Sequence, residues 1–492
     1  MLGSLLVVTG VIVLSYIWWK NLRPRNFPPG PQGIPFLGNL PSLGATPAVK
    51  LLEWKCKYGD VFGWYNGRQP VVVLSDFNTI RRVLGEDSAS GRINKRAFRN
   101  NHTSIPIGIG LLWSEGELWR THRRFALSTL RSLGMGRNWM EDSIIMEVEG
   151  FCQALRETNR KPFDPKVHLT NSVSNVICAL IFGKRFELTD PKFSKLTSLI
   201  ADNLSLVRME FLVRVLPFLM WFPNQVRGQI FKARQNETLI AEFMKARVRE
   251  QDGIGGKQAV GYVSAYRKEQ ELQRTDGVEN PLFTEIQLVG SLYDLFTAGT
   301  ESTATTVRWT MVFMIENPEI MLKVQREIDE TMGQKSVLTT AVRASLPYTE
   351  AVILEVQRCA NVFPLSVPHR TRDDVQIDGY TIPKDTLILP NLASIHRDER
   401  WWKNPETFNP SRFLDEDGKL TRPNDAFAPF GIGKRACLGE SLARTELFLF
   451  VANLLRCFTL ELPEGKTLSH KDYHSSIVDS PLPFELIFLP RF

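Results

Sequence analysis

Apolar residues recur at helical spacing along most of this chain, whereas the alternation typical of strands is confined to short runs. This periodicity predicts long helices with only small sheet elements between them. The predicted helices are Glu115–Leu133, Val167–Phe182, Lys192–Leu216, Gln225–Gln251, Glu285–Glu316, Pro318–Met332, Tyr348–Cys359 and Leu438–Phe458. The expected fold class is therefore mainly α with minor β.

Two predicted hairpins account for most of the β structure. Asn66–Gly67 and Asp378–Gly379 are dipeptides that favour tight two-residue turns. The short apolar runs that they separate are Val61–Tyr65 and Val71–Leu74, and Val375–Ile377 and Tyr380–Ile382. Gln251–Pro281 lies between two predicted helices and is rich in Gly, Gln and charge, which predicts a mobile surface loop within one domain.

The amino-terminal residues differ from the rest of the chain. Met1–Trp19 carries no charged side chain and approaches the length of about 20 residues that a membrane-spanning helix needs. Trp18 and Trp19 close this run, and basic residues follow it, without the small residues of a signal-peptide cleavage site. The pattern favours an uncleaved anchor over residues 1–20, with the rest of the chain in the cytosol; a buried core helix is the alternative.

A proline-rich segment follows the predicted anchor. The prolines from Pro24 to Pro31 exclude a helix and stiffen the backbone toward an extended form. Residues 21–34 are therefore expected to form a hinge between the anchor and one large domain, residues 35–492.

Charge and cysteine content exclude several classes of protein. The formal net charge is +7, but Lys and Arg are interleaved with acidic residues. An acidic protein partner or an anionic membrane surface is therefore expected, and no nucleic acid. The six cysteines lie far apart without a Cys-x-x-Cys pair, which supports neither a zinc site nor a disulfide framework.

One cysteine, Cys437, lies in the glycine-containing loop Phe430–Gly439, directly before a predicted helix. A metal-bound thiolate is stabilised by backbone N–H groups, a helix N-terminus and nearby positive charge, because each lowers the thiol pKa. Gly433 and Gly439 would allow close backbone approach, and Arg435 would supply charge. The loop also formally matches a dinucleotide fingerprint, but no strand precedes it, and no Ser or Thr follows its Gly-Lys pair. A nucleotide or phosphate site is not indicated.

This loop resembles the haem-binding loop of the cytochrome P450 family, which reads Phe-x-x-Gly-x-Arg-x-Cys-x-Gly. Every specified position is filled, by Phe430, Gly433, Arg435, Cys437 and Gly439. The resemblance implies that Cys437 is the axial ligand of a haem iron and that the cofactor is haem b (iron protoporphyrin IX). The resemblance extends from the hinge to the carboxyl end, and it is closest to the microsomal group that oxidises drugs and fatty acids.

Two further motifs of that family are present. Glu355 and Arg358 match its Glu-x-x-Arg, and Pro410–Phe413 matches its Pro-x-Arg-Phe. In the family, the arginine of the second motif, here Arg412, joins the first pair and locks the fold around the haem. Either motif alone carries little weight, but their order and separation agree with the family.

Further residues are implied to bind the haem. Trp119 and Arg123 are four residues apart, so that an indole N–H and a guanidinium can reach the same anionic group, such as a haem propionate. His369 resembles a propionate-contacting histidine of the family, and Ala298 is expected beside the haem. Without the resemblance, core packing beside a surface charge and a structural histidine explain these residues as well.

Hydroxyl groups and an acid interrupt the apolar pattern of Glu285–Glu316. Gly299 lowers helix stability but permits a kink where a small ligand can lie, and Glu301, Ser302 and Thr303 can relay protons. The family usually has threonine directly after the acid, whereas this chain has Ser302 there and Thr303 next. The hydroxyl is kept and one methyl is lost, which leaves open how tightly oxygen use is coupled to product.

The resemblance implies a P450 fold, with one catalytic domain and the haem between two long helices, anchored in the endoplasmic reticulum membrane. The implied activity is that of a haem-thiolate monooxygenase, which inserts one oxygen atom from O2 into a fatty acid, steroid or xenobiotic. Because no nicotinamide or flavin site is recognisable, electrons are expected from NADPH-cytochrome P450 reductase, with cytochrome b5 as a second donor. Lys434 is among the basic residues that suit an acidic docking face.

The substrate is expected to be lipophilic, because the segments implied to line the pocket are apolar. These are Ile105–Leu112, Leu204–Leu216, Phe296, Ala298 and Leu365–Val367. The apolar connection Pro217–Pro223 either contacts the bilayer or forms a packed core turn.

Two other functions stay open at this point. The first is a haem-thiolate isomerase or dehydratase that consumes a preformed peroxide; such enzymes commonly lack the acid–alcohol pair, so Glu301 and Ser302 argue against it. The second is a non-catalytic haem sensor, which substrate turnover with O2 and NADPH would exclude.

Overall fold

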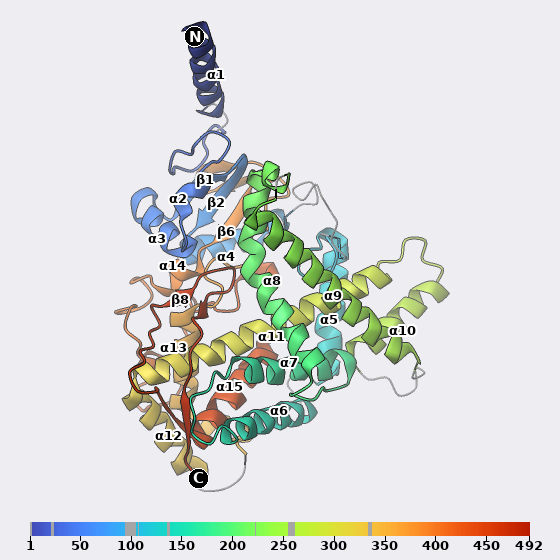
Figure 1. Ribbon diagram of the computed structural model, residues 1–492, viewed down its shortest axis with the longest axis vertical. Coiled ribbons are helices and arrows are strands. Elements are labelled where there is room, and N and C mark those ends of the chain that lie inside the picture. Colours follow the sequence, from blue (N-terminus) through green and yellow to red (C-terminus); the bar gives the residue numbers. More distant parts are fainter. Residues whose placement is uncertain are drawn as a thin grey trace.

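The computed structural model describes residues 2–20, 24–93, 105–106, 108–134, 138–221, 223–253, 261–332 and 337–492. Helices form most of the body, and a small sheet lies at the end from which α1 (Leu2–Lys20) projects (Figure 1). The predicted class, mainly α with minor β, is therefore confirmed.

The largest sheet is four-stranded, in the order β1-β2-β6-β3. β1 (Val61–Asn66) and β2 (Gln69–Leu74) form an antiparallel hairpin. On its other edge β2 pairs in parallel with β6 (Leu387–Pro390). β3 (His369–Arg370) completes the sheet antiparallel to β6. The remaining pairs are β4 (Val375–Ile377) with β5 (Tyr380–Ile382), β7 (Phe458–Glu461) with β10 (Ile487–Pro490), and β8 (Tyr473–His474) with β9 (Ser480–Pro481).

The two predicted hairpins are present, one of them with a shifted turn. Asp378 and Gly379 both have positive φ, 48° and 83°, as a tight Asp-Gly turn requires. At the other hairpin Asn66 pairs with Gln69, so the turn residues are Gly67 and Arg68 instead of Asn66 and Gly67. The sequence prediction was wrong by one residue there because Asn66 extends the strand.

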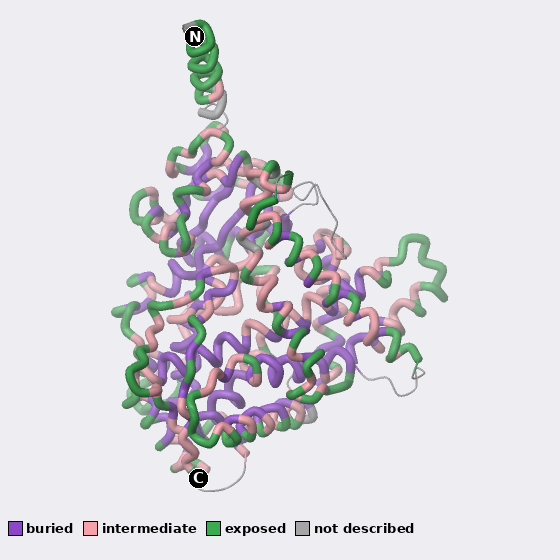
Figure 2. The backbone as a smooth tube through the Cα atoms, in the orientation of Figure 1, coloured by how far each residue is buried: buried purple, intermediate pink, exposed green. Residues whose placement is uncertain are grey.

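The helices of the body surround α11 (Glu285–Glu316), which begins at the capping side chain of Thr284 and ends before Pro318. α11 is buried along most of its length (Figure 2) and packs against α7, α9, α13 and α15. The other helices are α2 (Leu40–Leu43), α3 (Pro47–Tyr58), α4 (Phe77–Gly85), α5 (Gly116–Ser132), α6 (Asn138–Arg156), α7 (Lys166–Phe182), α8 (Pro191–Val215), α9 (Gln225–Gly253), α10 (Tyr262–Thr275), α12 (Pro318–Met332), α13 (Pro347–Ala360), α14 (Leu392–His396) and α15 (Glu440–Cys457).

The prediction of a mobile loop over Gln251–Pro281 was wrong. The middle of this segment is α10, a helix of 14 residues whose Tyr262 and Tyr266 are fully buried. Tyr266 packs edge to face with Phe125 of α5, with the ring centroids 5.7 Å apart. The spacing of the two tyrosines is helical, but the charged residues around them obscure this short apolar stripe in the sequence.

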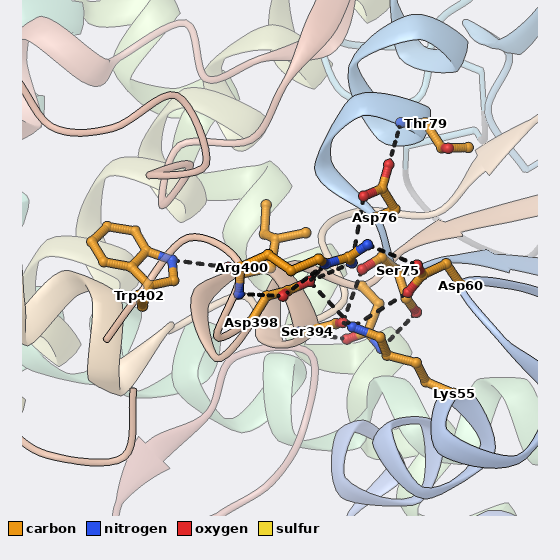
Figure 3. A network of polar contacts seen from close by, with 11 residues as sticks. Lys55, Asp60, Ser75, Asp76, Thr79, Ser394, Asp398, Arg400 and Trp402 are labelled. Atoms are coloured by element: carbon orange, nitrogen blue, oxygen red, sulfur yellow. Dashed lines mark hydrogen bonds and ion pairs between the residues drawn. The ribbon is translucent and has the colours of Figure 1, made fainter. Parts of the chain in front are cut away.

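A network of ion pairs ties the sheet end of the molecule to the segment after α14 (Figure 3). Arg400 donates to Asp398 over 2.9 Å and also pairs with Asp60 before β1 and with Asp76, which caps α4. Lys55 of α3 reaches Asp398 as well, at 3.5 Å. The network fixes the sheet against the chain that leads towards the Cys437 loop.

Among the helices within the described ranges, none combines the length and the apolar content needed to cross a bilayer.

Candidate active site

A cavity of about 310 Å³ lies beside the middle of α11, between α5, α7 and the loop that precedes α15. Most of its lining is apolar, including Leu111, Leu112, Ala298 and Val367. Cys437 lines this cavity, and its accessible surface faces the cavity and not the outside of the protein. The structure thus brings the loop cysteine and the helix with the hydroxyl cluster to one cavity.

The Cys437 loop is held by its own backbone. The Cys437 N–H donates to the Phe430 carbonyl at 2.9 Å, and the Gly439 N–H donates to the Cys437 sulfur. Burial raises the pKa of the Cys437 thiol, and the Gly439 N–H and Arg123 act in the opposite direction. The backbone N–H is therefore present as expected, but the positive charge that acts on the sulfur comes from Arg123 and not, as the sequence predicts, from Arg435. A cation at the sulfur would complete the ionisation of the thiol.

The two loop glycines have different roles. Gly433 has a φ of 81°, and a Cβ there would overlap the carbonyl of Leu84 at the end of α4. Gly433 therefore permits the close backbone approach that the sequence predicts. A Cβ at Gly439 would meet no atom of the described chain within 4 Å, so the expectation of close backbone approach is not met there. Gly439 instead lines the cavity and leaves that space free.

Gly433→Ala is expected to destabilise the protein by several kcal/mol, because the substitution combines a left-handed φ with a backbone clash. The check is the midpoint of urea unfolding, followed by circular dichroism. The matched control is Gly85→Ala at the end of α4, next to Leu84, where a Cβ would meet nothing within 4 Å. Equal midpoints for the two variants would contradict the prediction.

A cluster of buried and half-buried arginines borders the cavity. Arg435 donates to the carbonyl oxygens of Ser90 and Ser114, and its guanidinium carbon lies 3.8 Å from the centroid of the Trp119 ring. Arg123 donates to the Ala436 carbonyl at 2.6 Å, next to Cys437. The structure therefore brings Trp119, Arg123 and Arg435 together, as the resemblance implies.

A third arginine of this cluster was not predicted from the sequence. Arg92 donates to the carbonyls of Val367 and Pro368 and lines the cavity. It belongs to no motif, and only the folded chain brings it to Arg435. His369 follows Pro368, is buried, and its Nδ1 lies 2.9 Å from the Ala89 carbonyl oxygen.

Glu115 offsets only part of the positive charge of Arg92 and Arg435. Burial, with repulsion among the arginines, lowers the pKa of Arg435 to about 8 and that of Arg92 to about 9. Burial and the same arginines also lower the pKa of His369. Arg435 Nη1 and Arg92 Nε are buried without a hydrogen-bond partner. A bound group with carboxylates would satisfy them, and the propionates of a haem fit this donor set while Cys437 offers its iron a thiolate.

The hydroxyl cluster of α11 reaches the cavity in part. Ser302 and Thr303 line it, and the Ser302 hydroxyl donates to the Ala298 carbonyl at 2.6 Å. Glu301 is not part of the lining; it accepts a hydrogen bond from Thr305 at 3.4 Å, and its Oε2 is buried without a partner.

Gly299 does not interrupt α11, which continues through it as regular helix. A Cβ at Gly299 would overlap the Ile177 side chain of α7, so this glycine allows the two helices to pack closely. The expectation of a kink is therefore not met, and the glycine is explained by helix packing.

Two buried acids at the cavity were also not predicted. Burial raises the pKa of Glu446 in α15 to about 8, and its Oε2 accepts from the Thr303 hydroxyl at 3.2 Å. Burial raises the pKa of Asp294 in α11 to about 7, although it accepts from the N–H groups of Leu111 and Leu112. A lone acid within an apolar helical run is the signal that could have found both.

The two motifs outside the cavity also come together. Arg358 makes two hydrogen bonds of 2.8 Å to Glu355, and Arg412 adds a third of 3.0 Å to the same carboxylate. Glu355 and Arg358 are almost completely buried. Asn409 N–H also donates to Glu355, so both carboxylate oxygens are satisfied.

Some residues predicted to line the pocket do not. Phe296 is fully buried in the core, and Leu365 packs in the cluster beside the sheet. No described side chain of Leu204–Leu216 belongs to the cavity wall. The prediction relied on apolar character, which does not distinguish a core position from a cavity wall.

An apolar cavity with a thiol in its wall, bordered by arginines that have donors without partners, fits a haem-thiolate protein. The chain belongs to the cytochrome P450 family, whose model matches residues 28–488. It is 37% identical to cytochrome P450 2J2 of Homo sapiens, over 99% of this chain and 96% of that protein. It is 33% identical to cytochrome P450 2U1 of Homo sapiens, with 99% and 94% covered, and 35% identical to cytochrome P450 18a1 of Drosophila melanogaster, with 94% and 88% covered. The protein is therefore a haem-thiolate monooxygenase with haem b as cofactor.

Proposed function

We propose that this monooxygenase is anchored in the endoplasmic reticulum membrane and hydroxylates or epoxidises lipophilic molecules such as fatty acids, steroids or xenobiotics. Residues 35–492 form its cytosolic catalytic domain. The observation that carries the proposal is the position of Cys437 on the wall of an apolar cavity that Ser302 and Thr303 of α11 also line. Haem b, when bound, supplies the activation of O2.

Several residues around the cavity are proposed to bind the cofactor, each in a different way. Cys437 would supply the thiolate that ligates the haem iron. The side chains proposed to bind the propionates or pack against the ring are Trp119, Arg123, Ala298, His369, Phe430 and Arg435, with Gly433 and Gly439 shaping the loop. Arg92 joins this set because its Nε, like Arg435 Nη1, is buried without a hydrogen-bond partner. Glu355, Arg358 and Arg412 stabilise the fold beside it.

Protons are proposed to pass through the acid and hydroxyls of α11. The Ser302 hydroxyl donates to the Ala298 carbonyl, which fixes its position, and its oxygen can accept a hydrogen bond from a water in the cavity. Glu301 lies one residue before Ser302, outside the cavity lining, and its Oε2 has no hydrogen-bond partner; we propose that it supplies protons towards Ser302. Thr303 is engaged with Glu446 and can contribute a second path.

Two exposed apolar regions support the membrane assignment. The apolar side chains of α1 between Leu5 and Ile17 are largely exposed, and α1 extends away from the body (Figure 1). Between α8 and α9, Phe218 is 46% exposed and Trp221 is 75% exposed, which does not fit a packed core turn. We assign both regions to contact with lipid.

Electrons are proposed to come from NADPH-cytochrome P450 reductase, with cytochrome b5 as an additional donor. Lys434 lies in the Cys437 loop and is exposed. Its ammonium pairs with Asp87, which also pairs with Arg120. An acidic partner surface can replace Asp87 at these cations, so docking and release stay reversible.

Cys437→Ala is expected to abolish thiolate ligation. In the wild-type protein, reduction by dithionite under carbon monoxide should give the difference spectrum of a thiolate-ligated haem, and the variant should lose that band. Cys56→Ala, which removes an exposed cysteine of α3, is the control and should keep it. A band that survives in Cys437→Ala would refute the ligand assignment. Product formation with reductase, NADPH and O2 separates the proposal from a sensor, and inactivity with preformed peroxide alone separates it from an isomerase.

A further inference from the structure

Two cysteines far apart in the sequence meet at the opposite end of α15 from the Cys437 loop. Cys152 lies in α6, and Cys457 is the last residue of α15. Their thiols are hydrogen-bonded to each other. Arg156, one turn after Cys152 on the same face of α6, places its Nη2 at 3.5 Å from the Cys457 sulfur. Three groups from two packed helices thus form one cluster.

The two thiols have different surroundings. Cys152 is 3% exposed and belongs to the main core, whereas Cys457 is half-buried where α15 gives way to β7. Arg156 and Arg456 are the cations near Cys457, and Glu149 is the acid that acts on Cys152. The hydrogen bond from Cys152 and these cations lower the pKa of Cys457, and the same hydrogen bond with burial raises that of Cys152. These effects favour ionisation of the more accessible sulfur, that of Cys457, over that of Cys152.

We propose that Cys457 and Cys152 form an oxidant-sensitive thiol pair, in which Cys457 reacts with hydrogen peroxide and Cys152 then closes a disulfide. In the first step the Cys457 thiolate attacks one peroxide oxygen, the O–O bond breaks, and the products are a sulfenic acid and hydroxide, which takes up a proton. In the second step the Cys152 sulfur attacks the sulfenic sulfur and loses its proton, and water leaves. Two thiols are oxidised and one peroxide is reduced to two molecules of water.

The remaining cysteines do not share this arrangement. Cys178 is fully buried, and burial raises its pKa. Cys359 contacts Arg358, but burial raises its pKa to about 12. Cys437 is committed to the cavity, and Cys56 is exposed on α3. Cys56 is therefore the natural internal comparison, as an accessible thiol that is not part of the pair.

The test treats the full-length, haem-loaded protein with equimolar hydrogen peroxide, stops the reaction with catalase, and counts thiols after denaturation. The count should fall from six to four, and mass spectrometry without reductant should find the Cys152 and Cys457 peptides joined. Dithiothreitol should restore all six. Diamide, which oxidises adjacent thiols without the iron, should give the same cross-link and so exclude a reaction at the haem.

Variants separate the two steps. Cys152→Ser should stop at a sulfenic acid on Cys457 that dimedone traps, whereas Cys457→Ser should leave Cys152 reduced. Arg156→Gln should slow the first step, most clearly at pH 6, where an ordinary thiol of pKa ≈ 8.5 is protonated. Cys56→Ser should form the cross-link at the wild-type rate. Faster oxidation of Cys56 than of Cys457, or a dimedone adduct on Cys457 that persists in the wild-type protein, would overturn the proposal.

Discussion

Glu355→Ala is expected to lower the free energy of unfolding by about 3–5 kcal/mol, the usual cost of removing one partner from a buried ion pair. Glu355 accepts from Arg358 and Arg412 and from the Asn409 N–H, and its side chain is fully buried. The substitution would leave Arg358, which is 1% exposed, without its carboxylate in the protein interior. Because Arg412 belongs to the segment that leads to the Cys437 loop, loss of haem should accompany loss of stability.

The matched control lies on the same helix. Glu350→Ala breaks an ion pair of similar geometry, in which Arg343 donates over 2.8 and 2.9 Å. The side chain of Arg343 is 31% exposed, so solvent can replace the lost partner, and a loss of about 1 kcal/mol is expected. Urea unfolding followed by circular dichroism, together with haem content, measures both variants. A smaller loss for Glu355→Ala than for Glu350→Ala would show that the buried triad does not stabilise the fold.

The sequence allowed those parts of the site to be predicted that are encoded locally. The Cys437 loop is a continuous segment in which each position has a separate constraint, such as the left-handed φ of Gly433. Glu355 and Arg358 are one helical turn apart, so their contact follows from spacing alone. Arg412 was placed beside them only because a family motif supplied the long-range contact.

Long-range placement is what the sequence pattern could not give. Arg92 reaches Arg435 because Gly91 bridges to Arg370, which joins a segment before α5 to the strand β3. No local periodicity encodes that contact. The same reason explains Phe296 and Leu365, whose apolar character fits a cavity wall and a packed core equally well. Gly299 likewise is explained by its close packing against the neighbouring helix α7, and not by the chemistry of its own segment.

Glu446→Gln is expected to change how stability depends on pH. Burial raises the pKa of Glu446 from 4.5 to about 8, so the folded protein holds a proton there that the unfolded chain releases. The contribution of Glu446 to the free energy of unfolding is therefore constant below about pH 4.5. It falls as the pH rises from there towards 8, and it is constant again above pH 8. Each pH unit within this window costs about 1.4 kcal/mol when a single group titrates.

Glutamine removes this dependence, because it stays neutral and its amide oxygen can still accept the hydrogen bond from Thr303. The variant should match the wild type at pH 5 and exceed its stability by about 2–4 kcal/mol at pH 8, as linkage requires for a group that ionises only in the unfolded state. Urea unfolding at several pH values measures the difference. Glu461→Gln, at an exposed position of β7, should shift stability equally at all these pH values. A constant difference between Glu446→Gln and the wild type would mean that Glu446 is already ionised in the folded protein, and the Thr303 hydroxyl would then donate to a carboxylate beside the cavity.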